Sequence, residues 1–363
     1  MAENENDAGG FLSYIQKRFF ASSIVTSEGV VLYGFDALLH TYCDPKNDDQ
    51  KKFRLPGCTL SEIDGMPVVP ALEWIAGSVP NQLQRFWEFL NSSYSAFAVS
   101  TYIPLIFLLS SHFFVSLPLM VLEFVDFKPI KKYKIQKHRY NDAAMFKKCV
   151  RSILFYYIGV ILPVDAVSFP IFKAIGFRLA GPFPRWYFIL AQLAFCLVSE
   201  DFAHYWAHRA LHNTFLSKHI HSVHHEYAAP YGLAASYAHP LEIIALGICT
   251  FSGAMILRTH MFVFLVWAHI RQYAAIETHC GYEFPFSPRR WFPLWGGALY
   301  HDFHHSHRQG IFASNFIVWD WVFGTDVWFR DYYRKKAEKD AKVLSASRNT
   351  PGGNEEAQAK KAN

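Results

Sequence analysis

The sequence predicts an all-α integral membrane protein, built of several transmembrane helices plus a cytosolic helical cap. Hydrophobic residues make up 52% of the 363 residues and charged residues only 18%, whereas soluble domains average roughly 45–50% and 25%. Several stretches are long and apolar enough to cross a bilayer as helices. Eleven of the 18 histidines lie within residues 204–225 and 301–307. Disorder is excluded over most of the length, and a purely soluble enzyme fits less well than a membrane protein.

Composition divides the chain into three parts. Residues 1–95 mix polar, Gly/Pro-rich and short amphipathic pieces, none of which spans a bilayer, and they predict a partly ordered N-terminal region. Residues 96–333 are predicted to form the membrane-embedded domain that carries the histidines. Residues 334–363 are rich in Lys, Ala, Glu, Gly and Ser, which predicts a disordered cytosolic tail.

Charged segments indicate the direction of the predicted spans. The first, Phe89–Leu122, contains no Asp, Glu, Lys or Arg, and nine Lys and Arg residues follow between Lys128 and Arg151. Such a basic block stays in the cytosol, and it lacks the interleaved aromatic residues of a nucleic-acid platform. The later predicted segments are Ile153–Phe172, Trp186–Ser199, and a hairpin of Leu241–Leu257 and Met261–Ile270. This count puts residues 200–240 and 277–363 in the cytosol and leaves the side of the N-terminus open.

The last residues, Lys360-Lys361-Ala362-Asn363, match a dilysine signal, which retrieves membrane proteins to the endoplasmic reticulum when it lies in the cytosol. The six cysteines are scattered without a CxxC pair, as is typical of a reducing compartment. We therefore expect a multi-pass protein of the endoplasmic reticulum membrane with its C-terminus in the cytosol.

The histidine spacing predicts helical faces that carry metal ligands. Residues three or four apart share one face of a helix, and three histidine groups follow this rule: His208 and His212; His221, His224 and His225; His301, His304 and His305. One ion cannot use eight imidazoles, so the cap is predicted to hold a histidine-rich dimetal site. Neutral imidazole suits Zn, Fe, Cu or Ni.

Other histidines are less decisive. His204 shares the face of His208 but is left open between a ligand and a residue that orients a ligand ring. His239 and His279 lie at the cytosolic ends of apolar helices, and position alone gives each an even chance of ligation. His138, His219 and His307 are expected at the solvated surface.

These residues resemble the fatty acid hydroxylase/sterol desaturase superfamily of membrane di-iron oxygenases. The three boxes read HRALH at 208–212, HSVHH at 221–225 and HDFHH at 301–305. The connecting phrases are most similar to C-4 methylsterol monooxygenases: EDFAHYWAHR at 200–209, HHEYAAPYGLAASYAHPLE at 224–242, ETHCGYEFP at 277–285 and WDWVFGTD at 319–326. One departure is Gly310-Ile311-Phe312, where those enzymes typically have Gly-Asn-Tyr.

The resemblance implies two non-haem iron ions that activate O2 and oxidise the C-4 methyl group of a sterol, drawn from the bilayer, stepwise to a carboxylate. A separate sterol C-4 decarboxylase would then act on the product. The resemblance also implies the ligand set: His208, His212, His221, His224, His225, His239, His279, His301, His304 and His305. The reaction needs a redox metal, which zinc is not.

The reaction also consumes electrons, and the sequence contains neither a GxGxxG loop for a nucleotide cofactor nor a His-Pro-Gly-Gly segment of a fused cytochrome b5 domain. We therefore expect electrons from NADH through separate cytochrome b5 and its reductase. Two alternatives remain: a sterol C-5 desaturase or acyl-chain hydroxylase of the same superfamily, and a metal-transporting membrane protein. A transporter should carry its ligands at mid-membrane depth, whereas these histidines are predicted at the cytosolic ends of helices.

Overall fold

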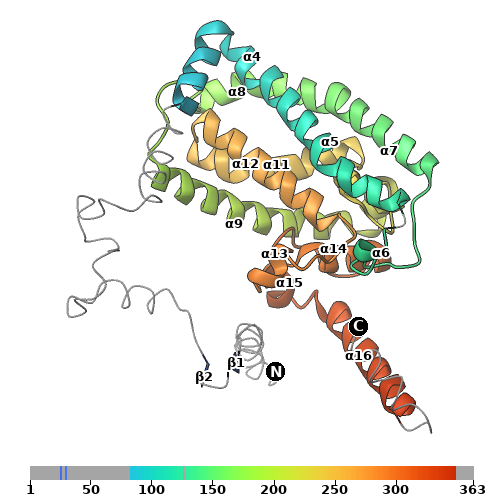
Figure 1. Ribbon diagram of the computed structural model, residues 1–363. Helices are drawn as coiled ribbons and strands as arrows, with labels where there is room; N and C mark the ends of the chain where they lie inside the picture. The colour runs from blue at the N-terminus through green and yellow to red at the C-terminus, as the bar shows by residue number, and fades with distance from the viewer. Residues whose placement is uncertain (1–24, 27–28, 31–81, 126, 349–363) are drawn as a thin grey trace, which may run out of the picture. The chain divides into compact units, whose positions relative to one another are not determined.

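The computed structural model describes residues 25–26, 29–30, 82–125 and 127–348 (Figure 1). The chain divides into two units, Met1–Ser93 and Tyr94–Asn363. The first unit contains a helix over residues 82–93 and two short antiparallel strands, β1 (Val25–Thr26) and β2 (Gly29–Val30). Most of the predicted N-terminal region, and the lysines of the dilysine signal, lie outside the described residues. The second unit contains the histidines.

Four helical stretches in the described residues are long and apolar enough to cross a membrane: Ala96–Phe124, Ala143–Ile175, Trp186–Leu211 and Pro240–Leu257. The first consists of α4 (Ala96–Ser100) and α5 (Tyr102–Phe124), and the second of α7 (Ala143–Tyr156), the π-helical turn η2 (Tyr157–Ile161) and α8 (Leu162–Ile175). The others are α9 (Trp186–Leu211) and α11 (Pro240–Leu257). The predicted all-α, multi-pass membrane fold is confirmed.

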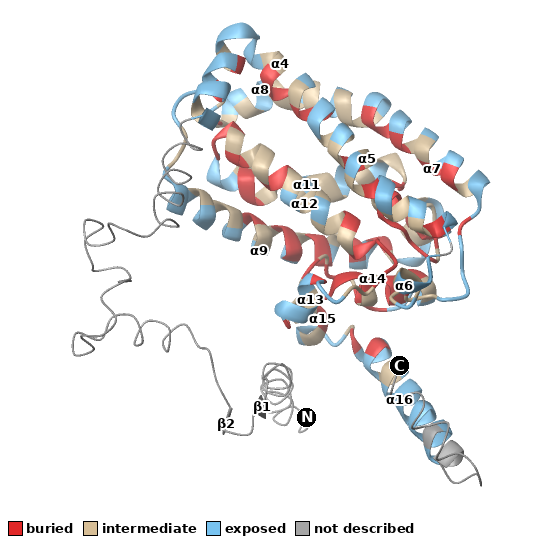
Figure 2. Cartoon of the chain, in the orientation of Figure 1, coloured by how far each residue is buried: buried red, intermediate tan, exposed pale blue. Residues whose placement is uncertain are grey.

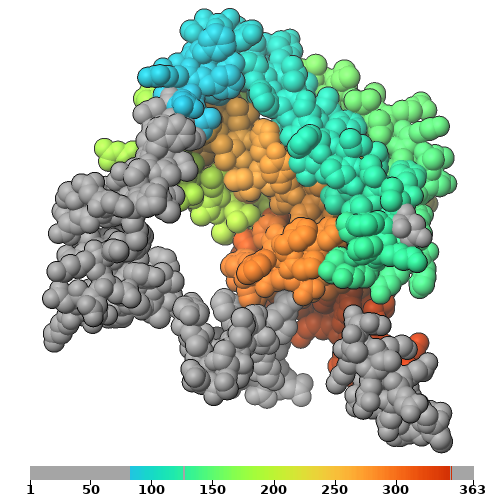
Figure 3. Space-filling model, viewed as in Figure 1, coloured from blue at the N-terminus to red at the C-terminus, as the bar shows by residue number. Residues whose placement is uncertain are grey.

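Exposed apolar side chains cover the outer faces of these helices. Phe114 of α5 is 81% exposed, and Trp186 at the start of α9 is 71% exposed. Exposed residues run along the long helices, whereas buried residues concentrate near the C-terminal end of α9 and around α14 (Figure 2). In the space-filling view, α5 (cyan) presents its side chains along one face of the unit (Figure 3). Such large apolar surfaces suit contact with lipid.

α11 and α12 (Met261–Thr278) form the predicted hairpin. Arg258 ends α11 in the left-handed conformation, and the His260 ring accepts a hydrogen bond from the Phe262 N–H to begin α12. α11 packs tightly on α9, since a Cβ on Gly253 would lie 2.8 Å from the Cys196 Cα. α12 continues past the predicted end at Ile270, and this extra length brings its C-terminal residues to the histidines.

The cap is made of short elements that gather at one end of the long helices (Figure 1). They are α6 (Lys128–Lys131), α10 (Thr214–Leu216), η3 (Ser217–His221), η4 (His224–Glu226), η5 (Gly232–Ser236), α13 (Pro288–Trp291), α14 (Gly297–His307) and α15 (Val318–Val322). α16 (Val327–Arg348) follows. Each cap element is too short to be stable by itself, so packing and side-chain hydrogen bonds fix the cap.

Residues 334–348 are helical in α16, rather than disordered as predicted. Lys, Ala and Glu, three of the residue types on which that prediction was based, are also strong helix formers. Arg334 forms ion pairs with Asp331 and Glu338, three and four residues away, and such pairs stabilise an exposed helix.

Candidate metal centre

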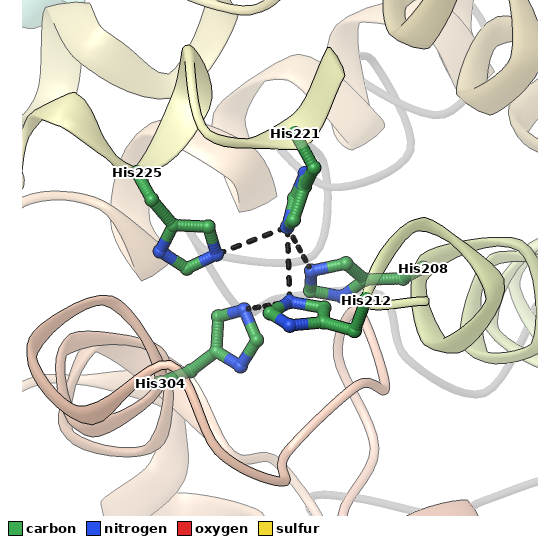
Figure 4. Close-up of side chains that lie close together, drawn as sticks. All are labelled: His208, His212, His221, His225 and His304. Carbon is green, nitrogen blue, oxygen red and sulfur yellow. Dashed lines mark hydrogen bonds between the residues drawn. The ribbon is translucent and has the colours of Figure 1, made fainter. Parts of the chain in front are cut away.

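Nine histidines form two compact groups, and within each group the ring nitrogens lie within 4.8 Å of one another. The five-histidine cluster contains His208, His212, His221, His225 and His304 (Figure 4). The four-histidine cluster contains His224, His279, His301 and His305. The clusters are neighbours, since the ring centroids of His225 and His305 are 4.7 Å apart. The predicted number of two metal sites therefore matches two separate groups of ligand atoms.

Helix ends supply most of these rings. His208 lies in the last turn of α9 and His212 is its C-terminal cap residue, whereas His279 caps the C-terminus of α12. His221 ends the π-helical turn η3, and such turns are frequent at functional sites. α14 contributes to both clusters, because His304 points to one and His301 and His305 to the other.

Backbone carbonyl oxygens determine which ring nitrogen carries the proton in the four-histidine cluster. The Nδ1 of His224 lies 2.9 Å from the Tyr237 carbonyl oxygen, and the Nδ1 of His279 lies 2.8 Å from the Ala275 carbonyl oxygen. A carbonyl oxygen can only accept, so both Nδ1 atoms are protonated and both Nε2 atoms carry lone pairs. These Nε2 atoms lie 3.2 Å apart. Two facing lone pairs repel, so this arrangement calls for a cation between them.

The five-histidine cluster follows the same rule. The Nδ1 atoms of His208 and His304 lie 2.9 Å and 2.7 Å from the carbonyl oxygens of Phe312 and Gly310. His221 differs because its Nδ1 lies 2.8 Å from the Glu242 carboxylate, a pairing that orients a ligand ring and raises its basicity. The Nε2 atoms then converge, as in Figure 4, with 3.1 Å between His208 and His221. The donor set fits a metal that prefers imidazole.

Burial keeps these imidazoles neutral. Desolvation lowers the pKa of His212 to about 4, and it also lowers the pKa values of His224 and His279. Desolvation also lowers the pKa values of further cluster members, and neighbouring histidines add to this, because protonating one ring would bring its positive charge close to theirs. These members are His221, His225, His301, His304 and His305. Neutral rings at pH 7 are the form that binds metals.

The segment from Gly310 to Phe312 has an unusual backbone conformation, and its carbonyl oxygens orient two candidate ligand rings. Ile311 has a φ of 57°, which is costly for a β-branched residue. Its side chain is 3% exposed in a core with Tyr300 and Phe329. The Asp320 carboxylate accepts hydrogen bonds from the Phe312 N–H at 2.7 Å and the Ala313 N–H at 2.9 Å. The sequence departure noted at Ile311 therefore lies between the carbonyls that orient His304 and His208.

Nine of the ten predicted ligands lie in the two clusters, and His239 does not. It is the N-terminal cap residue of α11, where its Nδ1 accepts a hydrogen bond from the Leu241 N–H at 3.2 Å. We therefore propose that His239 caps α11 and is not a metal ligand. The buried His204 also lies outside both clusters, with its Nδ1 3.5 Å from the Glu200 carboxylate. Three histidines are exposed as expected: His138, His219 and His307.

Glu242, the partner of His221, was not predicted from the sequence. Its only signal was an acidic residue within an otherwise apolar membrane segment, which usually has a functional reason. Glu242 is 1% exposed in the first turn of α11. Its pairing with the candidate ligand His221 explains why the Glu242 carboxylate is buried.

A cavity of about 380 Å³ opens from the clusters into the membrane helices. Five cluster histidines contribute to its lining: His208, His221, His224, His279 and His301. The remaining wall comes largely from apolar residues of α5, α8, α11 and α12, including Leu108, Val164, Phe251 and Phe264. Pockets of this size take small lipids or drug-sized molecules, so an apolar substrate can reach the cluster histidines from among the helices.

The fold and the site define a membrane protein with positions for two metal ions beside an apolar cavity. The chain matches the fatty acid hydroxylase family over residues 193–325. Very-long-chain aldehyde decarbonylase GL1-11 of Oryza sativa subsp. indica is 42% identical over 267 residues, which cover 72% of this chain and 98% of that protein. Methylsterol monooxygenase 2-2 of Arabidopsis thaliana is 41% identical over 260 residues, 70% of this chain and 96% of that protein.

A mammalian relative, methylsterol monooxygenase 1 of Rattus norvegicus, is 38% identical over 272 residues, which cover 73% of this chain and 92% of the rat protein. No solved structure matches this chain. The chain belongs to the fatty acid hydroxylase family of membrane oxidoreductases, and relatives at about 40% identity carry two kinds of names, methylsterol monooxygenase and very-long-chain aldehyde decarbonylase.

Proposed function

We propose that this protein is a C-4 methylsterol monooxygenase, which oxidises the C-4 methyl group of a sterol precursor stepwise to a carboxylate. The observation that carries the proposal is the apolar cavity that ends on cluster histidines. A sterol is nearly insoluble in water, and a cavity between membrane helices can receive it from the bilayer. The names of the plant and rat relatives support a sterol as substrate.

Nine histidines would hold two iron ions: His208, His212, His221, His225 and His304 in one cluster, and His224, His279, His301 and His305 in the other. Iron supplies an oxidant strong enough to break an unactivated C–H bond, whereas zinc has no redox chemistry. Backbone carbonyls and the Glu242 carboxylate keep the rings oriented. The apolar cavity wall limits the access of water to the reacting carbon.

Each oxidation takes one oxygen atom of O2 into the substrate and releases the other as water, so it consumes two electrons and two protons. We propose that these electrons come from NADH through cytochrome b5 and its reductase, and that a sterol C-4 decarboxylase uses the carboxylate product. We also propose the endoplasmic reticulum membrane as the location, with the site and the C-terminus in the cytosol, because the basic block at 128–151 favours this orientation.

A groove of about 520 Å³ on the cap suits an acidic electron donor. Its exposed cationic residues are Lys132, Arg139, Arg290 and Lys336, whereas Lys134 is buried and paired with Glu123, and Glu283 also lines the groove. Asp302, Phe303 and Ser306 of α14 also line it, and they alternate along that helix with the cluster residues His301, His304 and His305. A donor in this groove would be separated from the clusters by one helix, and complementary charge would speed its association.

A second candidate is the conversion of a very-long-chain aldehyde, since two of the most similar relatives carry the name aldehyde decarbonylase at 42% identity. The same apolar cavity can accept an acyl chain. The two functions predict different accumulating molecules when the protein is lost.

The deciding experiment combines profiling of cells that lack the protein with an assay of the purified chain in lipid nanodiscs. We expect 4-methyl or 4,4-dimethyl sterols to accumulate. We also expect iron-loaded protein, first reduced with dithionite and then freed of it, to oxidise a 4-methylsterol when O2 is added. Accumulation of long-chain aldehydes with normal sterols would favour the second candidate. A C-5-saturated sterol with normal C-4 demethylation would instead indicate a desaturase.

A further inference from the structure

Four polar side chains that line the cavity, here called the polar layer, take no part in the histidine clusters. They come from four different elements: His112 from α5, Tyr157 from η2, Ser236 from η5 and Gln272 from α12. All four line the cavity. Polar groups are costly within membrane helices and usually have a functional reason there. A shared layer from four elements is therefore a candidate recognition site.

Internal hydrogen bonds occupy Gln272. Its Nε2 donates to the Leu108 carbonyl oxygen at 3.1 Å and to the Ser111 hydroxyl at 2.8 Å, and its Oε1 lies 3.3 Å from the Tyr157 hydroxyl. This residue ties α5, η2 and α12 together. It fixes the position of the layer and has little capacity left for a ligand.

His112 and Ser236 make fewer internal hydrogen bonds than Gln272. The His112 ring is fully buried, and its Nε2 lies 3.3 Å from the Leu233 carbonyl oxygen. Because this oxygen only accepts, Nε2 carries the proton and Nδ1 is left as an acceptor. The Ser236 hydroxyl lies 3.5 Å from that Nδ1, which is long for a hydrogen bond. The Ser236 hydroxyl also has a hydrogen bond with the Tyr157 side chain. Because the His112 ring is fully buried, a ligand hydroxyl would form its hydrogen bond with the Ser236 hydroxyl, which His112 and Tyr157 orient.

The backbone connects Ser236 to the four-histidine cluster. The following residue, Tyr237, supplies the carbonyl oxygen that accepts from the His224 Nδ1 at 2.9 Å. Beyond the layer the cavity wall is mostly apolar and includes Val164, Phe172 and Phe264. A lipid with one polar end would therefore enter with that end at Ser236 and its apolar body among the helices.

We propose that Ser236, supported by His112, binds a hydroxyl group that the substrate carries on the ring carbon next to the one that bears the reacting methyl group. This inference rests on the proposed function, because a sterol has its hydroxyl on C-3, directly beside C-4. The hydrogen bond would hold the C-4 methyl group towards the cluster histidines. A long-chain aldehyde has no such hydroxyl and would gain nothing from the pair.

The test uses the full-length, metal-loaded protein in nanodiscs and two probes, a 4-methylsterol and its 3-deoxy analogue. In the unchanged protein we expect the hydroxylated sterol to bind more tightly than the analogue. Ser236→Ala should weaken binding of the hydroxylated sterol about fivefold, the loss expected for one neutral hydrogen bond, and should leave the analogue unaffected. His112→Gln should give a loss in the same direction.

Ser168→Ala is the matched control, since Ser168 lines the same cavity from α8, about three helical turns beyond Tyr157. It should not change the preference between the two sterols. The inference is overturned if Ser236→Ala keeps the full preference, or if the unchanged protein binds both sterols equally while still oxidising the 4-methylsterol. If neither sterol binds and a long-chain aldehyde is converted, the proposed function itself fails.

Discussion

The two histidine clusters lie side by side but differ in ligand number and in exposure to the cavity. Five imidazoles converge in one cluster and four in the other. Three of the four rings in the smaller cluster line the cavity, namely His224, His279 and His301, against His208 and His221 of the larger one. Metal sites that act on substrates keep coordination positions open, whereas structural sites fill them. We infer that the four-histidine cluster is the side on which substrate is oxidised.

The supports of the rings differ as well. In the four-histidine cluster, His224, His279 and His305 have backbone carbonyl oxygens at Nδ1. The five-histidine cluster adds a carboxylate, Glu242, at His221. A carboxylate partner strengthens a histidine ligand. More ligands and a stronger partner should make the larger cluster hold its metal more tightly than the smaller one.

Removing one ligand from each cluster tests this difference and should give the largest effects. His279→Ala leaves three imidazoles in the smaller cluster, so metal content should fall from about two ions per chain to about one, and turnover should be lost. His225→Ala leaves four imidazoles in the larger cluster and should retain more metal. Elemental analysis of purified protein measures both.

The control for these variants is His219→Ala, because His219 is exposed and outside both clusters. Its metal content should equal that of the unchanged protein. Equal metal loss in His279→Ala and His225→Ala would contradict the proposed difference between the clusters.

A glycine pair tests how the backbone supports the larger cluster. Gly310 has a φ of 61°, and an added Cβ would lie 2.1 Å from the Thr325 carbonyl oxygen, whereas Gly324 has a φ of 65° and open space around it. Gly324→Ala should cost about 1–2 kcal/mol from the left-handed conformation alone. Gly310→Ala should cost more than about 3 kcal/mol and move the carbonyl that orients His304. Thermal unfolding and metal content measure the contrast, and similar effects at both positions would contradict it.

The sequence predicted that the histidines form a metal site, but it did not predict which histidine belongs to which of the two clusters. The spacing of His221, His224 and His225 suggested one shared helical face, but His224 belongs to the smaller cluster and the other two to the larger. The box at 301–305 is divided in the same way. Local spacing cannot predict this division, because acceptors from distant segments orient the rings, including the Tyr237 and Gly310 carbonyls.

The membrane helices were predictable for a simpler reason. Each described span contains a long apolar stretch, and length and hydropathy alone identify it. The bounds of the cap elements could not be predicted in this way. Elements such as α10 and η4 are three residues long, which is too short for a periodic pattern. Their positions depend on buried polar contacts, such as those of Asp201 with the N–H groups of Asn315 and Phe316.

Glu242→Gln should give an intermediate effect confined to the larger cluster. The amide keeps an oxygen that can accept from the His221 Nδ1 but removes the negative charge. Changes to such partners typically reduce metal affinity 10–100-fold. Release of metal to a chelator should therefore become faster for one of the two ions only. Faster release of both ions would show that the clusters are not independent.

His239→Ala should give the smallest effect and separates capping from ligation. Position alone predicted the same even chance of ligation for His239 and His279, since both lie at the cytosolic ends of apolar helices. The His239 ring instead accepts from the Leu241 N–H at the start of α11, whereas the His279 Nε2 lies 2.8 Å from the His301 Nε2.

Loss of this cap should reduce the free energy of unfolding by about 0.5–2 kcal/mol, while metal content and the rate of metal release stay unchanged. His239→Asn, which restores a capping side chain, should recover the lost stability. Loss of one metal ion in both His239 variants would return this residue to the ligand set, because an asparagine that caps the helix would then have failed to replace the imidazole.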